Sequence, residues 1–429
     1  MTLAHATHDA EAVQPRSVRD ILRGNWLVSL PGVAVPTRSL PYELTSSRWP
    51  PTYPFFALVV ATGVLAGVLG RRQGPVDYAL AALGLWIALD LTIMGIGTAT
   101  PPWNQLTREL LTLFAGLVLF RIAQTSERKL AIVYGLRAAL VLCGGWGVYQ
   151  YFVGLPFLLS QGYGSGFYFA TADGTYRPFG TFFSPTVYGG FLAMLGIAVI
   201  ATLTRSLYFW LTFVAVASVL LMTETRSAII AFAVAFAIVL FQSGRARGVR
   251  LAVAIAAMGY AIIGYQFWKP PYVASALERL FSASNDADTS SVTRQALWQG
   301  VIDGLDHQGA WLTGFLARDF VPTISPYTGL TVARLGHPHS NYFQELYRYG
   351  LPGLALFVAL LLAMWWTIRQ GRASVPLSMN TAALAGVVVF AVDSIFNNSL
   401  SSLNVFVGLL LIAGLGSVPS RRKLDLGDR

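Results

Sequence analysis

Long apolar stretches alternate with short polar connectors along most of the chain, and this pattern predicts membrane-spanning helices. A run of about 20 apolar residues, rising about 1.5 Å per residue, crosses the ~30 Å hydrocarbon core of a bilayer. Such runs recur from residue 53 to residue 418. The predicted spans are 53–70, 77–98, 105–123, 131–153, 187–204, 207–222, 227–242, 249–268, 342–368, 380–396 and 401–418.

The pattern therefore predicts an all-α polytopic membrane protein with about 11–12 transmembrane helices. Segment 25–44 begins apolar and is interrupted by three prolines, and we expect it to form a short, broken first span; the alternative is an interfacial segment. The expected division is an N-terminal segment (1–52), a first set of helices (53–268), a large loop (269–341), C-terminal helices (342–418) and a tail (419–429).

Charge supports this class and gives an orientation. Charged residues make up only 12% of the chain, against roughly 25% in soluble domains. Most Lys and Arg fall in every second connector, so these connectors and the tail are expected in the cytoplasm. The net charge of +10 is therefore spread over connectors, without the contiguous basic face that nucleic-acid binding needs. The single cysteine, Cys143, excludes an internal disulfide and a thiolate metal cluster.

Two long connectors, 154–186 and 269–341, are expected to face away from the cytoplasm. Both are rich in aromatic residues, and the second contains a predicted amphipathic helix at 291–305. Long loops of this kind in compact proteins are usually functional lids or binding loops.

Several arginines lie on this outward side, where the positive-inside rule does not predict them. They are Arg108, Arg177, Arg226, Arg294 and Arg334. Guanidinium grips phosphate oxygens in a bidentate way, so converging arginines suit a diphosphate. Each could instead pair with a carboxylate, as Arg226 could with Glu224, or extend to the lipid headgroups.

His337 and His339 flank Pro338 just before the span at 342–368. A histidine with a near-neutral pKa can take a proton from a sugar hydroxyl. The alternatives are a loop histidine that caps the next helix, and a metal site, for which the spacing offers no clear third ligand. No metal or cofactor is expected.

Two carboxylates, Asp90 and Asp393, lie within predicted spans. Intramembrane acids often serve proton relays, but they can also hydrogen-bond a neighbouring helix. Arg137, in the span at 131–153, is the expected partner of Asp90.

Three stretches together resemble the O-antigen ligase and polymerase superfamily. Residues 339–353 (HSNYFQELYRYGLPG) are similar to its signature, a His followed by polar and aromatic residues and then Gly-x-x-Gly at a span. Residues 177–182 (RPFGTF) and 225–228 (TRSA) resemble its other two motifs. Two departures are Arg348, where relatives often have Glu, and Ser340, where Asn is commoner; Glu345 could compensate for the first.

The resemblance implies a C-type glycosyltransferase of the bacterial inner membrane, with its active site and large loop on the periplasmic face. It implies an inverting, metal-independent transfer of a glycan from undecaprenyl diphosphate. His339 would be the base, Arg177, Arg226 and Arg294 would hold the diphosphate, and His337, Arg334, Glu345 and Arg108 are lesser candidates.

Three functions compete. A ligase would use lipid A–core as its acceptor, whereas a polymerase would extend a growing polysaccharide from the same donor. A transporter or flippase of a lipid-linked sugar predicts charges near the bilayer midplane and pseudo-symmetric halves, whereas here the charges crowd one face and no inverted repeat is visible.

Overall fold

The computed structural model describes residues 73–97, 103–160, 176–180, 182, 184–242, 289–315, 318–328 and 337–418. The predicted spans 53–70 and 249–268, the segment 25–44 and the tail 419–429 lie outside these residues, as does Arg334.

Each predicted span within the described ranges coincides with a helix, and the predicted amphipathic helix is α12. The helices are α4 (Pro75–Gly97), α5 (Trp103–Ala123), α6 (Ser126–Ser160), α7 (Pro185–Ala201), α8 (Ser206–Thr223), α9 (Arg226–Gln242), α12 (Thr289–Gln308), α13 (Phe320–Thr328), α14 (Asn341–Gly371), α15 (Leu377–Phe396) and α16 (Leu403–Leu415).

By length and composition, five of the described helices can cross a membrane: α4, α6, α8, α14 and α15. Shorter apolar helices are α7, α9 and α16. The described ranges contain no strand. The chain is therefore an all-α polytopic membrane protein, as the hydrophobic pattern predicts.

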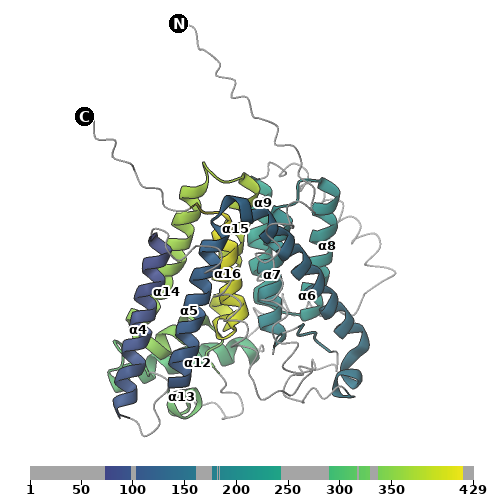
Figure 1. Cartoon of the computed structure of the whole chain (residues 1–429). Helices are drawn as coiled ribbons and strands as arrows, with labels where there is room; N and C mark the ends of the chain where they lie inside the picture. Colours follow the sequence, from purple (N-terminus) through teal and green to yellow (C-terminus); the bar gives the residue numbers. More distant parts are fainter. Residues whose placement is uncertain are drawn as a thin grey trace, which may run out of the picture.

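The centre of the bundle is α7. A helix without a polar face is expected to be surrounded by protein or lipid on all sides, and every residue of α7 from Tyr188 to Ala201 is buried. It packs against α6, α8, α9, α15 and α16. Figure 1 shows α4, α5 and α14 to one side of it and α6 and α8 to the other.

Buried cations stabilise one end of the bundle, which we call the basic end. Arg121 on α5 donates to Asp77 on α4 at 2.9 Å. The ammonium group of Lys129 donates to the backbone carbonyls of Leu415 and Ser417, both at 2.6 Å. These carbonyls follow the last turn of α16 and have no partner within that helix, so Lys129 acts as its cap.

The opposite end, which we call the α12 end, is crossed by α12 and α13 (Figure 1). Here α14 is interrupted at Gly350, whose φ is 65° and ψ −165°, so that residues 341–349 form a segment separate from residues 351–371. The turn after α12 touches this break directly: a Cβ on Gly314 would lie 2.6 Å from the Gly350 nitrogen. Backbone packs on backbone because neither residue has a side chain.

The polar groups freed by the break in α14 are bonded to other elements. Hydrogen bonds run from the Phe315 N–H to the Tyr347 carbonyl (2.7 Å), from the Trp86 indole to the Tyr349 carbonyl (3.1 Å) and from the Leu351 N–H to the Trp311 carbonyl (2.8 Å). Irregular backbone at membrane depth is tolerated where protein covers it in this way. The first turns of α14 are thereby fixed relative to α4 and α12.

We predict that Gly314→Ala destabilises the protein more than Gly309→Ala. Both glycines have positive φ, 64° and 61°, but a Cβ at Gly309 meets nothing within 4 Å. Gly309→Ala should therefore cost only the left-handed strain, about 1–2 kcal/mol, while Gly314→Ala adds a clash with the α14 backbone. Thermal unfolding in detergent measures the difference. Equal melting temperatures for the two variants would contradict the direct contact between the turn and the break.

Candidate functional site at the α12 end

Four helix ends meet at the α12 end: the N-terminal ends of α7, α9 and α14 and the C-terminal end of α15. Asn397, just after α15, joins three of these elements. Its side-chain amide donates to the Thr186 carbonyl on α7 at 2.9 Å and to Asp393 at 3.1 Å. Its own carbonyl accepts from the N–H of Asn341, the first residue of α14, at 3.1 Å.

The two histidines lie at the entry to α14 in an unusual backbone conformation. His339 has a φ of 53°, one of two non-glycine residues with positive φ in the described ranges. Such strain persists only where the surroundings hold it, and it is common at functional sites. The His339 N–H donates to Nδ1 of His337 at 3.2 Å, and the ring centroids are 4.1 Å apart. Ser340 then caps α14 by accepting from the Phe343 N–H.

Trp298 fixes α12 against this entry. Its indole donates to the Pro338 carbonyl, between the two histidines, at 2.8 Å. Its ring stacks on Phe343 with 5.0 Å between centroids and 4° between planes. Arg294 lies one turn earlier on α12, and residues four apart share a helix face, so its guanidinium charge is brought beside the imidazoles.

The surroundings keep both histidines neutral. Burial, with a smaller contribution from the charge of Arg294, lowers the pKa of His337 to about 4. Burial, then His337 and Arg294, lower the pKa of His339 to about 3. At neutral pH each ring therefore has one unprotonated nitrogen, and that of His337 is Nδ1, which accepts the His339 N–H.

The hinge between α8 and α9 is held by Arg177. Its Nε donates to the Thr223 carbonyl at 2.7 Å, and a terminal nitrogen donates to Thr225 Oγ1 at 3.4 Å. Thr225 Oγ1 in turn donates to the Pro185 carbonyl at the start of α7. Glu224 adopts the left-handed conformation that ends α8. Arg177 thus uses two of its N–H groups to hold the hinge against α7.

The segment that carries Arg177 is itself fixed by α6. The side-chain amide of Gln150 both donates to the carbonyl of Gly180 and accepts from its N–H, each at 2.8 Å. This reciprocal pair satisfies a buried backbone unit outside any helix. The two predicted motifs at 177–182 and 225–228 are therefore brought together.

Arg226 is the first residue of α9 and is partly buried. The side chain of the next residue, Ser227, hydrogen-bonds Asp393 near the end of α15. The hinge is thereby connected to the carboxylate that also accepts from Asn397, and Arg226 enters the same cluster of helix ends as the histidines.

Asp393 is a central group that the sequence analysis did not include among the site residues. It is 2% exposed, and α7 approaches it closely at Gly190, where a Cβ would collide with the carboxylate. Its Oδ1 has no hydrogen-bond partner among the described residues. The charge of Arg294 acts on it as it does on the histidines. The available signal was its position near a span end, on the same side as the histidines.

Asn341 was also missed, although it lies within the histidine motif. Its side-chain nitrogen donates to Ser394 Oγ at 2.7 Å and Ser399 Oγ at 3.1 Å, and its Oδ1 accepts from the Leu400 N–H at 2.9 Å. Both N–H groups and the carbonyl of this buried amide are used to join α14 to the end of α15 and the residues that follow it. A sequence motif alone gives no sign of this partner, which lies more than 50 residues away.

Two other predicted residues belong to a separate cluster, beside α5. Glu345 is buried next to Arg348, which contacts Glu109 on α5 at 3.3 Å. Arg108 lies 3.9 Å from the same carboxylate, and its side chain is 60% exposed. Glu345 and Arg108 are therefore neighbours of Arg348 and Glu109, and the structure does not bring them to the histidines.

The expected pairing of Asp90 with Arg137 is wrong. Arg137 donates to the carbonyl and hydroxyl of Thr202, at 3.1 and 3.3 Å, beyond the end of α7. Asp90 lies on α4 close to Tyr349 of α14, and one of its oxygens has no hydrogen-bond partner among the described residues. Sequence position could not show that α4 packs chiefly against α14 and α5.

The described residues include no group of three or more His, Cys, Asp or Glu side chains arranged to hold a metal ion. The chemistry that the site offers is a neutral, partly buried imidazole, nearby guanidinium groups and a buried carboxylate.

In a comparison with known protein families, one segment of the chain matches a family. Residues 211–358 match the family described as O-antigen ligase. The matched segment contains the hinge, Arg226, Arg294 and both histidines, while Arg177 and Asp393 lie outside it. No curated protein matches the chain. Over this segment the chain is similar to the O-antigen ligase family, which supports its resemblance to the O-antigen ligase superfamily.

Proposed function

We propose that the protein transfers a glycan from undecaprenyl diphosphate to an acceptor hydroxyl, and that it acts as an O-antigen ligase with lipid A–core as acceptor. The family match supports a membrane glycosyltransferase of the ligase and polymerase type. The observation that carries the proposal is the neutral, partly buried His339 beside Arg294, at the end of the bundle where the start of α9, with Arg226 and Ser227, contacts Asp393 of α15.

In this reaction His339 accepts the proton of the acceptor hydroxyl. The hydroxyl oxygen forms a bond to the anomeric carbon as the bond from that carbon to the diphosphate oxygen breaks. The electron pair leaves with the diphosphate, and attack from the opposite face inverts the anomeric configuration. General-base catalysis of this kind contributes about 10²–10⁴-fold.

The arginines stabilise the leaving diphosphate, whose negative charge grows in the transition state. Preorganised cations in a low-dielectric site are worth more than the same groups in water. Arg226 and Arg294 are the direct candidates. Arg177 donates two hydrogen bonds to the hinge, so we propose that it positions Arg226. Its charge also adds to the positive potential of the site.

Donor binding also prepares the base. The pKa of His339 is low in the unliganded protein partly because of Arg294. A bound diphosphate places negative charge near the same guanidinium and offsets its effect, so the pKa of His339 rises toward the operating pH. A base with a pKa nearer the operating pH takes the hydroxyl proton more effectively.

The orientation follows from the connectors. Lys and Arg gather at the basic end, which we assign to the cytoplasm by the positive-inside rule. The α12 end then faces the periplasm of a bacterial inner membrane, where the large loop containing α12 and α13 meets the lipid-linked donor. A polymerase would use the same groups with a second lipid-linked glycan as acceptor, and it remains the main alternative.

We predict that His339→Ala and Arg226→Ala each abolish transfer from an undecaprenyl diphosphate-linked oligosaccharide to lipid A–core by the purified protein. The matched control is His307→Ala, because His307 is exposed at the end of α12 and contacts Tyr327 only through its ring. The control should keep native activity.

Product analysis separates the alternatives. Elongation of the donor in the absence of lipid A–core would show that the protein is a polymerase rather than a ligase. If neither mixture gave a product while the His339→Ala protein still bound donor, the catalytic proposal would be wrong, and a transporter of lipid-linked sugar would take its place.

The pH profile gives a second prediction. Because the pKa of His339 in the free protein is about 3, kcat/KM should keep its value well below pH 6.5, the ordinary histidine pKa. Protonation of His339 removes the base, so activity falls as pH drops through this pKa. Arg294→Gln removes a nearby positive charge, raises the pKa of His339 and moves the acid limb to higher pH.

Arg318→Gln is the control for that experiment, since Arg318 is exposed at the same end and bonds Gln308. It should leave the limb unchanged. An acid limb that stays in place in Arg294→Gln, with activity reduced, would mean that Arg294 acts on the substrate alone.

A further inference from the structure

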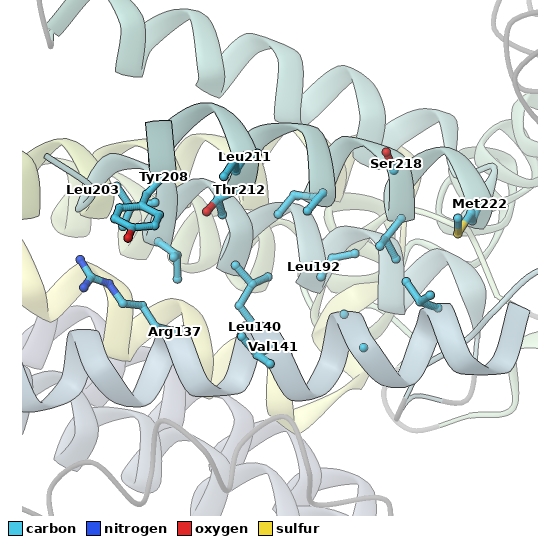
Figure 2. A pocket seen from close by; sticks show the side chains of 17 residues that line it. Arg137, Leu140, Val141, Leu192, Leu203, Tyr208, Leu211, Thr212, Ser218 and Met222 are labelled. Carbon is cyan, nitrogen blue, oxygen red and sulfur yellow. The ribbon is translucent and has the colours of Figure 1, made fainter. Parts of the chain in front are cut away.

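A cavity of about 710 Å³ lies between α6 and α8, apart from the site described above. It extends along α8 from Tyr208 to Met222, which at about 1.5 Å per residue is about 21 Å. Most of its lining is aliphatic, including Leu140, Leu192 and Val216. Figure 2 shows the side chains of the two helices facing each other across it.

Two adjacent glycines keep this cavity open on the α6 side. Gly144 and Gly145 both line it, and a Cβ built on either meets nothing within 4 Å. Small residues in membrane helices usually allow close helix packing, but here no described residue fills the space next to them. The cavity therefore has room for a flexible apolar chain.

One end of the cavity is polar. Arg137 of α6 lines it there, and Figure 2 shows its guanidinium directed toward Tyr208 of α8. One terminal nitrogen donates to Thr202, whereas Nε is buried without a hydrogen-bond partner in the described part of the chain. The described residues give Arg137 no carboxylate within salt-bridge distance. Arg137 is partly buried, and a cation at membrane depth without a counter-ion is costly.

A second cation lies at the same mouth. Arg205, at the N-terminal boundary of α8, lies over the Tyr208 ring at 6.0 Å and is exposed. It makes no side-chain cap to α8, so the first N–H groups of that helix add partial positive charge. The described residues that line the cavity include no acidic side chain. The mouth is therefore complementary to a net negative headgroup rather than a zwitterionic one.

We propose that this cavity binds an anionic phospholipid, with its phosphate between Arg137 and Arg205 and one acyl chain along the groove over Gly144 and Gly145. The polar mouth is at the basic end, whereas the other end of the cavity reaches Met222, beside the hinge. The tail of a donor bound at the α12 end would therefore enter from the Met222 end and make no use of the two cations. The inference does not depend on the proposed transferase function.

The test is lipid retention by the full-length protein. The protein is placed in nanodiscs of equal phosphatidylglycerol and phosphatidylethanolamine, re-extracted into mild detergent, and its bound lipids are counted by native mass spectrometry. The native protein should retain phosphatidylglycerol selectively. Arg137→Gln should lower this retention about tenfold, the loss expected for one charge-assisted contact to phosphate.

Two further variants make the result specific. Gly144→Leu should also lower retention, because its side chain enters the groove without touching Arg137, and leucine favours the helix more than glycine. Arg372→Gln should have no effect, because Arg372 is exposed at the basic end and does not line the cavity. Thermal unfolding establishes that each variant is folded.

Equal retention of both lipids, or unchanged phosphatidylglycerol in Gly144→Leu, would overturn the proposal. Loss of a co-purified polyprenyl lipid from Gly144→Leu, with Arg137→Gln unaffected, would also overturn it and assign the groove to a donor tail.

Discussion

The need to satisfy every backbone polar group in hydrocarbon shapes this molecule more than any other constraint. A peptide group without a partner there costs several kcal/mol, so the chain leaves the helix only where another group replaces the lost hydrogen bond. In the described residues several of these replacements lie at the α12 end, and Lys129 and Asn380 provide others at the basic end. Trp86 donates to a backbone carbonyl at the break in α14, Arg177 to one at the hinge before α9, and Asn397 to one at the start of α7.

The same replacements build the candidate site. A side chain that satisfies a helix end must be polar and must reach across to a second helix, and so it draws several helix ends together. Asn341 and Asn397 join α14, α15 and α7 in this way. Asp393 lies among these helix ends with one oxygen unpaired among the described residues. Helix interruption and site formation thus have one physical origin.

Cations at the two ends differ in their surroundings rather than in their chemistry. At the basic end, Lys129 is fully occupied as the cap of α16, and Arg121 is paired with Asp77. At the α12 end, Arg294 faces two imidazoles and a carboxylate. Its positive charge opposes protonation of the histidines and is favourable for an anionic ligand. The partners of each cation therefore decide whether it stabilises the fold or the substrate.

The sequence by itself determined the class, the helix positions and the principal candidates. An apolar run of about 20 residues leaves few structures other than a membrane-spanning helix. The helices α4 to α9 and α14 to α16 accordingly coincide with predicted spans. His339, Arg226 and Arg294 were identifiable because charged or titratable groups beside a span are costly without a role.

Only the tertiary structure decided which residues meet. Glu345 is adjacent to the histidines in the chain, yet α14 directs it to Arg348 and Glu109, while Asp393 approaches them from another helix. The partner of Arg137 and the groove beside it depend on how α6 packs against α7 and α8. Helix packing depends on the summed fit of many side chains, which no local pattern in the sequence records.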